Sequence, residues 1–436
     1  MASGAHSKKS GRAPVRGVAA IAIVVGVVGL VVAVAGATNA VNHGKHAPSQ
    51  AKAAPTTIPP TPISLLSFSP TANATNVAAA TPVTLHFSAP LAADTAQPTI
   101  SPSVAGSWTT AGSTMTFTPA GGWIPFTTVK VTVPSGLAGA AGSDTTPLAS
   151  AASVSFTVAP GSTLRLQELL AELGYLPLKF TPTSPAPTTT TPTTTVPDTA
   201  TSGPSTAGTS PSSSGTLPVP STSPSTSTPT TSTASSSAAT NAVTTSPVPG
   251  TFSWRFPNTP SSLKDQWAQG LPNTIDRGAI MAFQSAHGLA TDGVAGPDVW
   301  STLLVAAAKD QANTRPYNYL MVSESSPETL QVWSDGRIIA SSLANTGISA
   351  APTALGTYPV YARYASTTMT GLNPDGTKYR DPGVRWVAYF NGGDAVHQFP
   401  RPGYGWPQSL GCVELPSSTA ENIWGTDPIG TLVSVL

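Results

Sequence analysis

The chain has few charged residues, with neither sign in excess, and a single cysteine. Of 436 residues only 9% are Asp, Glu, Lys or Arg, and 20 basic residues nearly balance 19 acidic ones. No global field therefore attracts a polyanion, which argues against nucleic acid binding. The chain has no Gly-rich phosphate loop, and apart from His43 and His46 its metal-ligating side chains do not cluster, so no cofactor or metal is expected.

The first charges stand before a long apolar run. The segment 1–16 holds Lys8, Lys9, Arg12 and Arg16, and the segment 17–37 is uncharged. As a helix this run is about 30 Å long, which matches the hydrocarbon thickness of a bilayer. The charge asymmetry predicts a cytoplasmic tail, a single-pass anchor in the cell membrane, and the bulk of the chain in the extracytoplasmic space of the cell wall. The alternative is a signal peptide cleaved near Ala37 or Ala40, which gives a secreted protein.

The lone cysteine, Cys412, is unexpected in an exported chain. Cysteines of proteins in oxidising compartments normally pair within the molecule, and this one has no partner. Three interpretations remain open: a buried small hydrophobe, an intermolecular disulfide, and a nucleophile.

The N-terminal half begins with a linker and continues with a β pattern. Residues 38–62 are small, polar and proline-rich, which is typical of a flexible tether. Residues 63–158 contain short alternating runs, such as Val83, Leu85 and Phe87, between Gly and Pro clusters. This pattern predicts a β-sandwich that resembles bacterial immunoglobulin-like domains. We expect it to act as a spacer, with ligand binding as the alternative.

Three short helical segments follow, divided by a low-complexity stretch. Residues 162–177 carry leucines at helical spacing, and two further helical runs lie around Phe283 and after Pro297. Residues 181–250 are almost wholly Pro, Thr, Ser, Ala and Gly, a composition that predicts disorder. The pieces on either side resemble a peptidoglycan-binding helical module spanning 161–307, with 181–250 as an insertion. Loop closure entropy grows slowly enough with length to allow such an insertion.

Residues 316–436 have a mainly β pattern with long loops. A hairpin turn is indicated at Asp335 and Gly336, and the segment 384–390 is strongly β-prone. The predicted fold class is therefore a multidomain, mainly β protein with a small three-helix module and one N-terminal transmembrane helix. In the C-terminal region the only histidine is His397, fifteen residues before Cys412.

The residues around this pair resemble the L,D-transpeptidase catalytic domain family. Ala-Val-His ends at His397, and after a loop Ser-Leu-Gly-Cys-Val contains Cys412. The upstream Thr346-Gly347 and the stretch 352–358 are similar to other segments of that family. The resemblance implies a catalytic β-sandwich over residues 316–436. The adjoining resemblance to peptidoglycan-binding modules implies the same partner, with stem peptides and glycan strands bound.

The chemistry fits these residue types. A thiolate attacks an amide carbonyl, and a neighbouring imidazole takes the thiol proton and returns one to the leaving amine. Cys412 is thus the expected nucleophile and His397 the expected base and acid. The resemblance implies that Ser409 orients His397. Gly411 is expected to shape an oxyanion site from the N–H groups of residues 410–412.

By this resemblance the substrate is a tetrapeptide stem of peptidoglycan. The nucleophile attacks the bond between diaminopimelate and D-alanine, releases D-alanine, and passes the acyl group to an amine of a neighbouring stem as a 3-3 cross-link. Water as the acceptor gives an L,D-carboxypeptidase instead, and a third alternative is a wall-binding protein without catalysis. The resemblance also implies that carbapenem-type β-lactams inhibit covalently.

Several positions depart from the family pattern. Gln398 replaces a Gly, Ala354 a Pro, Leu410 a frequent His or Lys, and Glu414 the usual Arg or Asn. An anionic Glu414 close to the thiol disfavours the thiolate, unless it binds a substrate amine or amide. Besides Leu410 and Glu414, three aromatic residues are expected to contact substrate, with ordinary packing as their alternative: Tyr364, Tyr404 and Trp406.

Overall fold

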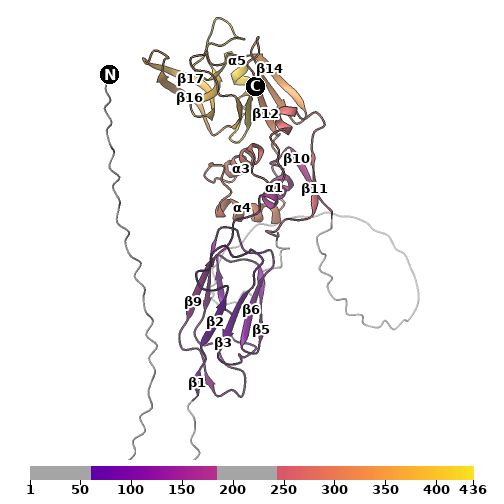
Figure 1. Ribbon diagram of the computed structural model, residues 1–436, viewed down its shortest axis with the longest axis vertical. Coiled ribbons are helices and arrows are strands. Elements are labelled where there is room, and N and C mark those ends of the chain that lie inside the picture. The colour runs from indigo at the N-terminus through magenta and orange to yellow at the C-terminus, as the bar shows by residue number, and fades with distance from the viewer. Residues whose placement is uncertain (1–59, 184–242) are drawn as a thin grey trace, which may run out of the picture. The chain divides into compact units, whose positions relative to one another are not determined.

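A computed structural model describes residues 60–183 and 243–436. The predicted cytoplasmic tail and anchor, nearly all of the linker 38–62 and most of the insertion 181–250 lie outside the described residues. Within those residues, no helix combines the length and the apolar character needed to cross a membrane. Figure 1 colours the described chain from indigo to yellow in sequence order.

The N-terminal region is the predicted β-sandwich. One sheet has the order β2-β3-β6-β5, the other β4-β7-β9, and β1 pairs with β8. The alternating apolar residues of β3 and β7 point into a core that also holds Trp123 and Phe156, both almost fully buried. The strands are β1 (Thr61–Pro62), β2 (Leu65–Ser69), β3 (Val83–Phe87), β4 (Thr99–Ser101), β5 (Gly106–Ala111), β6 (Thr114–Pro119), β7 (Thr128–Val133), β8 (Thr145–Thr146) and β9 (Ala152–Thr157).

The helical region contains the three predicted helices and one short additional helix. Ser162 caps α1 through its side chain, Asn273 caps α3, and Pro297 is the first residue of α4. Leu169, Phe283 and other buried apolar residues of these helices form one core. The elements are α1 (Thr163–Glu172), β10 (Leu178–Pro182), β11 (Gly250–Trp254), α2 (Ser261–Lys264), α3 (Thr274–Ala286) and α4 (Pro297–Ala308).

The segments on the two sides of the insertion pair directly. Strands β10 and β11 are antiparallel, with Leu178 opposite Trp254 and Pro182 opposite Gly250. The N–H of Thr183 donates to the carbonyl of Pro249 at 2.9 Å, just beyond this ladder. The sequence segments before and after the insertion are therefore paired with each other and share one core.

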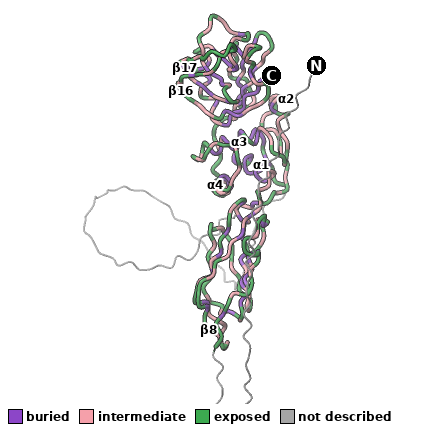
Figure 2. Tube along the Cα trace, turned by 60° about the vertical axis from the view of Figure 1, so that its left-hand side comes forward, coloured by how far each residue is buried: buried purple, intermediate pink, exposed green. Residues whose placement is uncertain are grey.

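The C-terminal region consists of two sheets and one helix. The first sheet has the order β14-β13-β12-β20-β15 and the second β16-β17-β18-β19. Buried residues of both sheets, such as Val322 and Val396, pack in one core (purple in Figure 2). The elements are β12 (Asn318–Ser323), β13 (Thr329–Ser334), β14 (Arg337–Leu343), β15 (Gly356–Pro359), β16 (Ala362–Leu372), β17 (Lys378–Asn391), β18 (Asp394–Gln398), β19 (Val413–Leu415), α5 (Ser417–Ile423) and β20 (Leu432–Val435).

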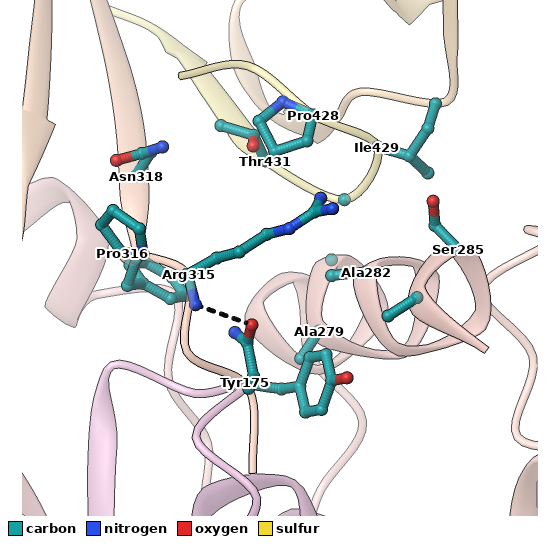
Figure 3. A pocket seen from close by; sticks show the side chains of 15 residues that line it. Tyr175, Ala279, Ala282, Ser285, Arg315, Pro316, Asn318, Pro428, Ile429 and Thr431 are labelled. Carbon is teal, nitrogen blue, oxygen red and sulfur yellow. Dashed lines mark hydrogen bonds between the residues drawn. The ribbon is translucent and has the colours of Figure 1, made fainter. Parts of the chain in front are cut away.

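Helix α3 packs on the segment before β20. A Cβ atom placed on Gly278 of α3 lies only 2.6 Å from the carbonyl oxygen of Gly430, so this approach requires glycine. Beside this contact is a cavity of about 70 Å³. In Figure 3 the side chain of Arg315 extends through it, between Ala282 of α3 and Pro428. The volume suits a few water molecules and is too small for a stem peptide.

Candidate active site

Cys412 and His397 are placed by two adjacent parallel strands. Strand β18 pairs with β19, with Val396 opposite Val413 and His397 opposite Glu414. Val396 and Val413 point into the core. Because side chains alternate along a strand, the residues next to each of them point to the opposite face. Cys412, directly before β19, therefore lies on the same face as His397, and both line one cleft.

His397 is buried, and its tautomer is defined by its hydrogen bond. Its Nδ1 lies 2.8 Å from the carbonyl oxygen of Gln398. Since a carbonyl oxygen only accepts, Nδ1 carries the proton and Nε2 has its lone pair available as a base. Burial lowers the pKa of His397 below its ordinary value, although the bond to Gln398 opposes this shift. The imidazole is therefore neutral at physiological pH.

Cys412 is a protonated thiol in the free protein. Burial raises the pKa of Cys412 to about 12; the N–H of Ala395 lowers it, and the carboxylates of Asp394 and Glu414 raise it further. The thiol donates weakly to the carbonyl of Gly393 at 3.6 Å. The shifts of both pKa values therefore favour a neutral thiol beside a neutral imidazole over a preformed ion pair.

The turn before the nucleophile depends on Gly411 and Ser409. Gly411 has φ +113°, a conformation that disfavours any other residue, and a Cβ there lies 2.6 Å from Oδ1 of Asp394. The hydroxyl of Ser409 donates to the carbonyl of Cys412 at 2.5 Å and accepts from the N–H of Gly411 at 3.2 Å. The N–H groups of Leu410 and Cys412 have no protein acceptor among the described residues and remain available for an oxyanion.

Two sequence predictions about this turn differ from its geometry. The N–H of Gly411 is occupied by Ser409, so Gly411 contributes its conformation, not its own donor. The hydrogen bonds of the described residues include none between Ser409 and His397, because the Ser409 hydroxyl is already used within the turn. Gln398, through its carbonyl, orients the imidazole instead.

The upstream motif holds this turn in place. The N–H groups of Gln408 and Ser409 donate to the carbonyl of Thr346, each at 3.0 Å. Thr346 is itself fixed by the buried carboxylate of Glu328, which accepts from its N–H at 2.6 Å and its hydroxyl at 2.8 Å. The N–H of Gly347 donates to the hydroxyl of Thr353 at 2.8 Å. The Thr-Gly segment and the stretch 352–358 thus support the nucleophile.

Glu414 is neutralised by an arginine. Nε and Nη2 of Arg401 donate to its two carboxylate oxygens at 2.8 and 2.7 Å. The side chain of Glu414 is 5% exposed and that of Arg401 29%. A bidentate pair of this kind is a strong charge-assisted interaction with a fixed geometry. The unfavourable effect of Glu414 on the thiolate is therefore reduced, and Glu414 is not free to bind a substrate amine.

The cleft has a volume of about 350 Å³, large enough for part of a peptide. Of the substrate contacts predicted from sequence, Leu410 and Glu414 line it. Tyr364 and Trp406 are about half exposed elsewhere, and Tyr404 uses its hydroxyl to bond the carbonyl of Phe399. The cleft residues that the sequence did not indicate are Met369, Asn373, Tyr379, Asp381, Phe399, Arg401 and Gln408.

The described residues contain no group of three or more His, Cys, Asp or Glu side chains arranged to hold a metal ion. The cleft itself presents a thiol, an imidazole, unpaired N–H groups and charged side chains. Together these groups are suited to acyl transfer through a thioester.

Comparison with known families identifies three domains. Residues 59–158 match the bacterial Ig-like domain, residues 277–303 a peptidoglycan binding domain, and residues 317–435 the L,D-transpeptidase catalytic domain. The chain thus matches the three kinds of domain that its sequence resembles, and the match to the L,D-transpeptidase catalytic domain covers nearly all of its C-terminal region. No curated protein matches the chain.

Solved structures of L,D-transpeptidases are also similar. One from Mycobacterium smegmatis is 13% identical and covers 86% of this chain and 100% of its own, with a TM-score of 0.25. The catalytic domain of the E. faecium enzyme is 25% identical over 28% of this chain and 100% of its own, with a TM-score of 0.26. L,D-transpeptidase 3 from Mycobacterium tuberculosis, in complex with a faropenem-derived adduct, is 14% identical. The match covers 85% of this chain and 97% of that one, with a TM-score of 0.25.

Proposed function

We propose that this protein is a peptidoglycan L,D-transpeptidase that forms 3-3 cross-links. The observation that carries the proposal is the placement of His397 on β18 and of Cys412 directly before the adjacent parallel strand β19, both lining one cleft in the region that matches that domain. The donor is a tetrapeptide stem, and the bond broken joins diaminopimelate to D-alanine.

In the first half-reaction the proton of the Cys412 thiol moves to Nε2 of His397 as the sulfur attacks the diaminopimelate carbonyl carbon. The oxygen of the tetrahedral intermediate accepts from the N–H groups of Leu410 and Cys412, which have no other acceptor among the described residues. The C–N bond then breaks, and the imidazolium gives its proton to the nitrogen of D-alanine. D-alanine leaves, and a thioester remains.

In the second half-reaction an amine of a neighbouring stem attacks the thioester. Neutral His397 takes a proton from this amine, and the amide forms as the thiolate leaves and is reprotonated by the imidazolium. Water attacking in the same way gives a carboxypeptidase. The half-exposed rim of the cleft, with Leu410 in place of a cation, offers an apolar surface against which an acceptor stem can exclude water.

The other domains support a role at the cell wall. The helical region 161–307 is proposed to bind peptidoglycan and the Ig-like domain to act as a spacer, with the chain held to the membrane by the segment 17–37. Because Cys412 lines an open cleft, we also propose that carbapenem-type β-lactams acylate it.

The test is incubation of the protein with tetrapeptide stems and, separately, with a carbapenem, followed by product analysis and intact mass measurement. The expected results are release of D-alanine, a cross-linked dimer, and an adduct at Cys412. Free tripeptide without dimer identifies a carboxypeptidase. Absence of both an adduct and D-alanine release overturns the proposal and leaves a non-catalytic wall protein.

A control separates catalysis from wall binding. Cys412→Ala is expected to abolish D-alanine release while binding to isolated sacculi is retained. Loss of sacculus binding in this variant contradicts an independent wall-binding region.

A further inference from the structure

The cleft beside Cys412 contains a guanidinium whose hydrogen-bonding capacity is only partly used. Arg401 has five N–H groups. The Nε–H and one N–H of Nη2 donate to Glu414, and the second N–H of Nη2 donates to the carbonyl of Gln408 at 3.2 Å. Both N–H groups of Nη1 lack a protein acceptor among the described residues. The guanidinium carbon lies 4.7 Å from the centre of the Phe399 ring, so stacking also fixes its orientation.

The same cleft contains a carboxylate without a partner. Asp381 lies on β17 opposite Met369, and both side chains line the cleft with Cys412. Its oxygens have no side-chain hydrogen bond, and no ion pair joins it to Arg401, within the described part of the chain. It is close enough to raise the pKa of both His397 and Arg401. A guanidinium with two unpaired N–H groups and a carboxylate without a partner therefore face one cavity and are not bonded to each other.

We propose that Arg401 and Asp381 bind the two charges of the zwitterionic side-chain end of the donor diaminopimelate. Nη1 of Arg401 donates to its carboxylate, and Asp381 accepts from its ammonium. This inference rests on the proposed function, which brings the other carboxyl carbon of the same residue to Cys412. Three methylene groups separate the two ends of diaminopimelate, so one cleft accommodates both.

The pairing explains why a single charge fits less well. A ligand with only a carboxylate leaves Asp381 without a partner, and a ligand with only an amine leaves Nη1 of Arg401 without an acceptor. A ligand with both charges satisfies each side chain. Glu414 acts here as a positioning residue, because its two hydrogen bonds fix Arg401 with Nη1 unpaired.

The experiment measures kcat and KM for D-alanine release by the full-length protein with three donors. The first has a free diaminopimelate side-chain end, the second carries a carboxamide in place of its carboxylate, and the third carries an acetylated amine. The wild type is expected to lose about 10- to 100-fold in kcat/KM with either modified donor, mainly through KM.

Two variants give crossed expectations. Arg401→Gln is expected to discriminate no longer between the carboxylate and the carboxamide while still rejecting the acetylated donor. Asp381→Asn is expected to show the reverse. Arg401→Lys, which keeps the charge, is expected to retain part of the carboxylate preference. The matched control is Arg363→Gln, because Arg363 also pairs with a buried carboxylate, Asp427, but does not line the cleft.

The outcomes separate this inference from the proposed function. If both variants keep the wild-type preference, or lose activity equally with all three donors, the recognition roles are wrong even though the enzyme works. If the wild type releases no D-alanine, the proposed function fails. The recognition roles are then decided by calorimetry, which measures binding of the three donors to the Cys412→Ala protein. The same measurement is made on Cys412→Ala proteins that also carry Arg401→Gln or Asp381→Asn.

Discussion

Glu414, two residues beyond Cys412, forms a bidentate ion pair with Arg401. The carboxylate is buried and the guanidinium partly exposed, so removal of either partner has different consequences. We expect Arg401→Ala to destabilise the catalytic domain by about 2 to 4 kcal/mol, because it leaves a buried charge unpaired. Glu414→Ala should cost about 1 kcal/mol, because its arginine can reach water.

The measurement is hydrogen exchange of the β18 and β19 amides in full-length protein. The pair Arg363 and Asp427 is a control with the same asymmetry of exposure elsewhere in the domain. Equal costs for the two Arg401–Glu414 variants, or a larger cost for Glu414→Ala, contradict the explanation.

The pH dependence of acylation follows from the two shifted pKa values. Burial lowers the pKa of His397 below 6.5, so the imidazole becomes a base at a lower pH than free histidine. The thiol of Cys412, with a pKa of about 12, remains protonated across the physiological range. We expect kcat/KM for D-alanine release to rise through an apparent pKa below 6.5 and to stay level through neutral and mildly alkaline pH.

Alkylation provides an independent check on the protonation state of the thiol. Iodoacetamide should modify Cys412 slowly at neutral pH, at well under the rate of a free cysteine, because little thiolate is present. Fast alkylation with a midpoint near neutral pH would show a preformed thiolate and imidazolium pair and contradict this mechanism.

Gly411 should tolerate no side chain. Its φ of +113° is strained for any other residue, and the added Cβ collides with Asp394. Gly411→Ala is expected to displace the N–H groups of the turn and lower kcat by about 10² or more. Gly393→Ala is the control, since a Cβ there meets no atom within 4 Å. A variant at Gly411 with full activity refutes the proposed oxyanion site.

Asp276 in α3 should destabilise the helical region at neutral pH. Its Oδ1 is buried without a hydrogen bond partner, and burial raises its pKa to about 7. Because the folded pKa exceeds the unfolded one, the stability from its protonation is complete below about pH 3.8 and is lost as pH rises through 7. Asp276→Asn should therefore slow hydrogen exchange of the α3 amides at pH 8, which corresponds to a rise of about 1 to 2 kcal/mol in their opening free energy.

The comparison with pH 4 decides the cause. At that pH the two proteins should differ little, since the carboxyl is protonated in the folded state. Destabilisation by Asp276→Asn at both pH values would mean that Asp276 is already charged in the folded state at pH 4, which contradicts the raised pKa.

The sequence predicts the pieces of this site better than their assembly. Cys412 and His397 follow from residue type and motif, because a lone thiol and a lone histidine in one domain leave few alternatives. Arg401 and Asp381 were not predicted, because they reach the cleft through a loop and through the register of β17, which no local pattern specifies. The sequence alone shows that Glu414 is unusual at its position, but it does not show that Arg401, thirteen residues earlier, pairs with it.

The same distinction applies to the aromatic residues. Tyr404 and Trp406 lie close to the motif in sequence, yet their side chains do not line the cleft. Proximity along a loop does not determine direction, whereas the period of a strand does, which is why His397 and Cys412 share a face.

The β10–β11 hairpin has a consequence for how this chain can vary between relatives. Its ladder joins the two ends of the insertion, and the Thr183–Pro249 bond closes it. Any change in the length of the intervening segment is therefore absorbed outside the ladder, without altering the helices or the active site. The two ends of the segment are thus held together whatever the number of residues between them, so the packing of the helical region does not depend on that number.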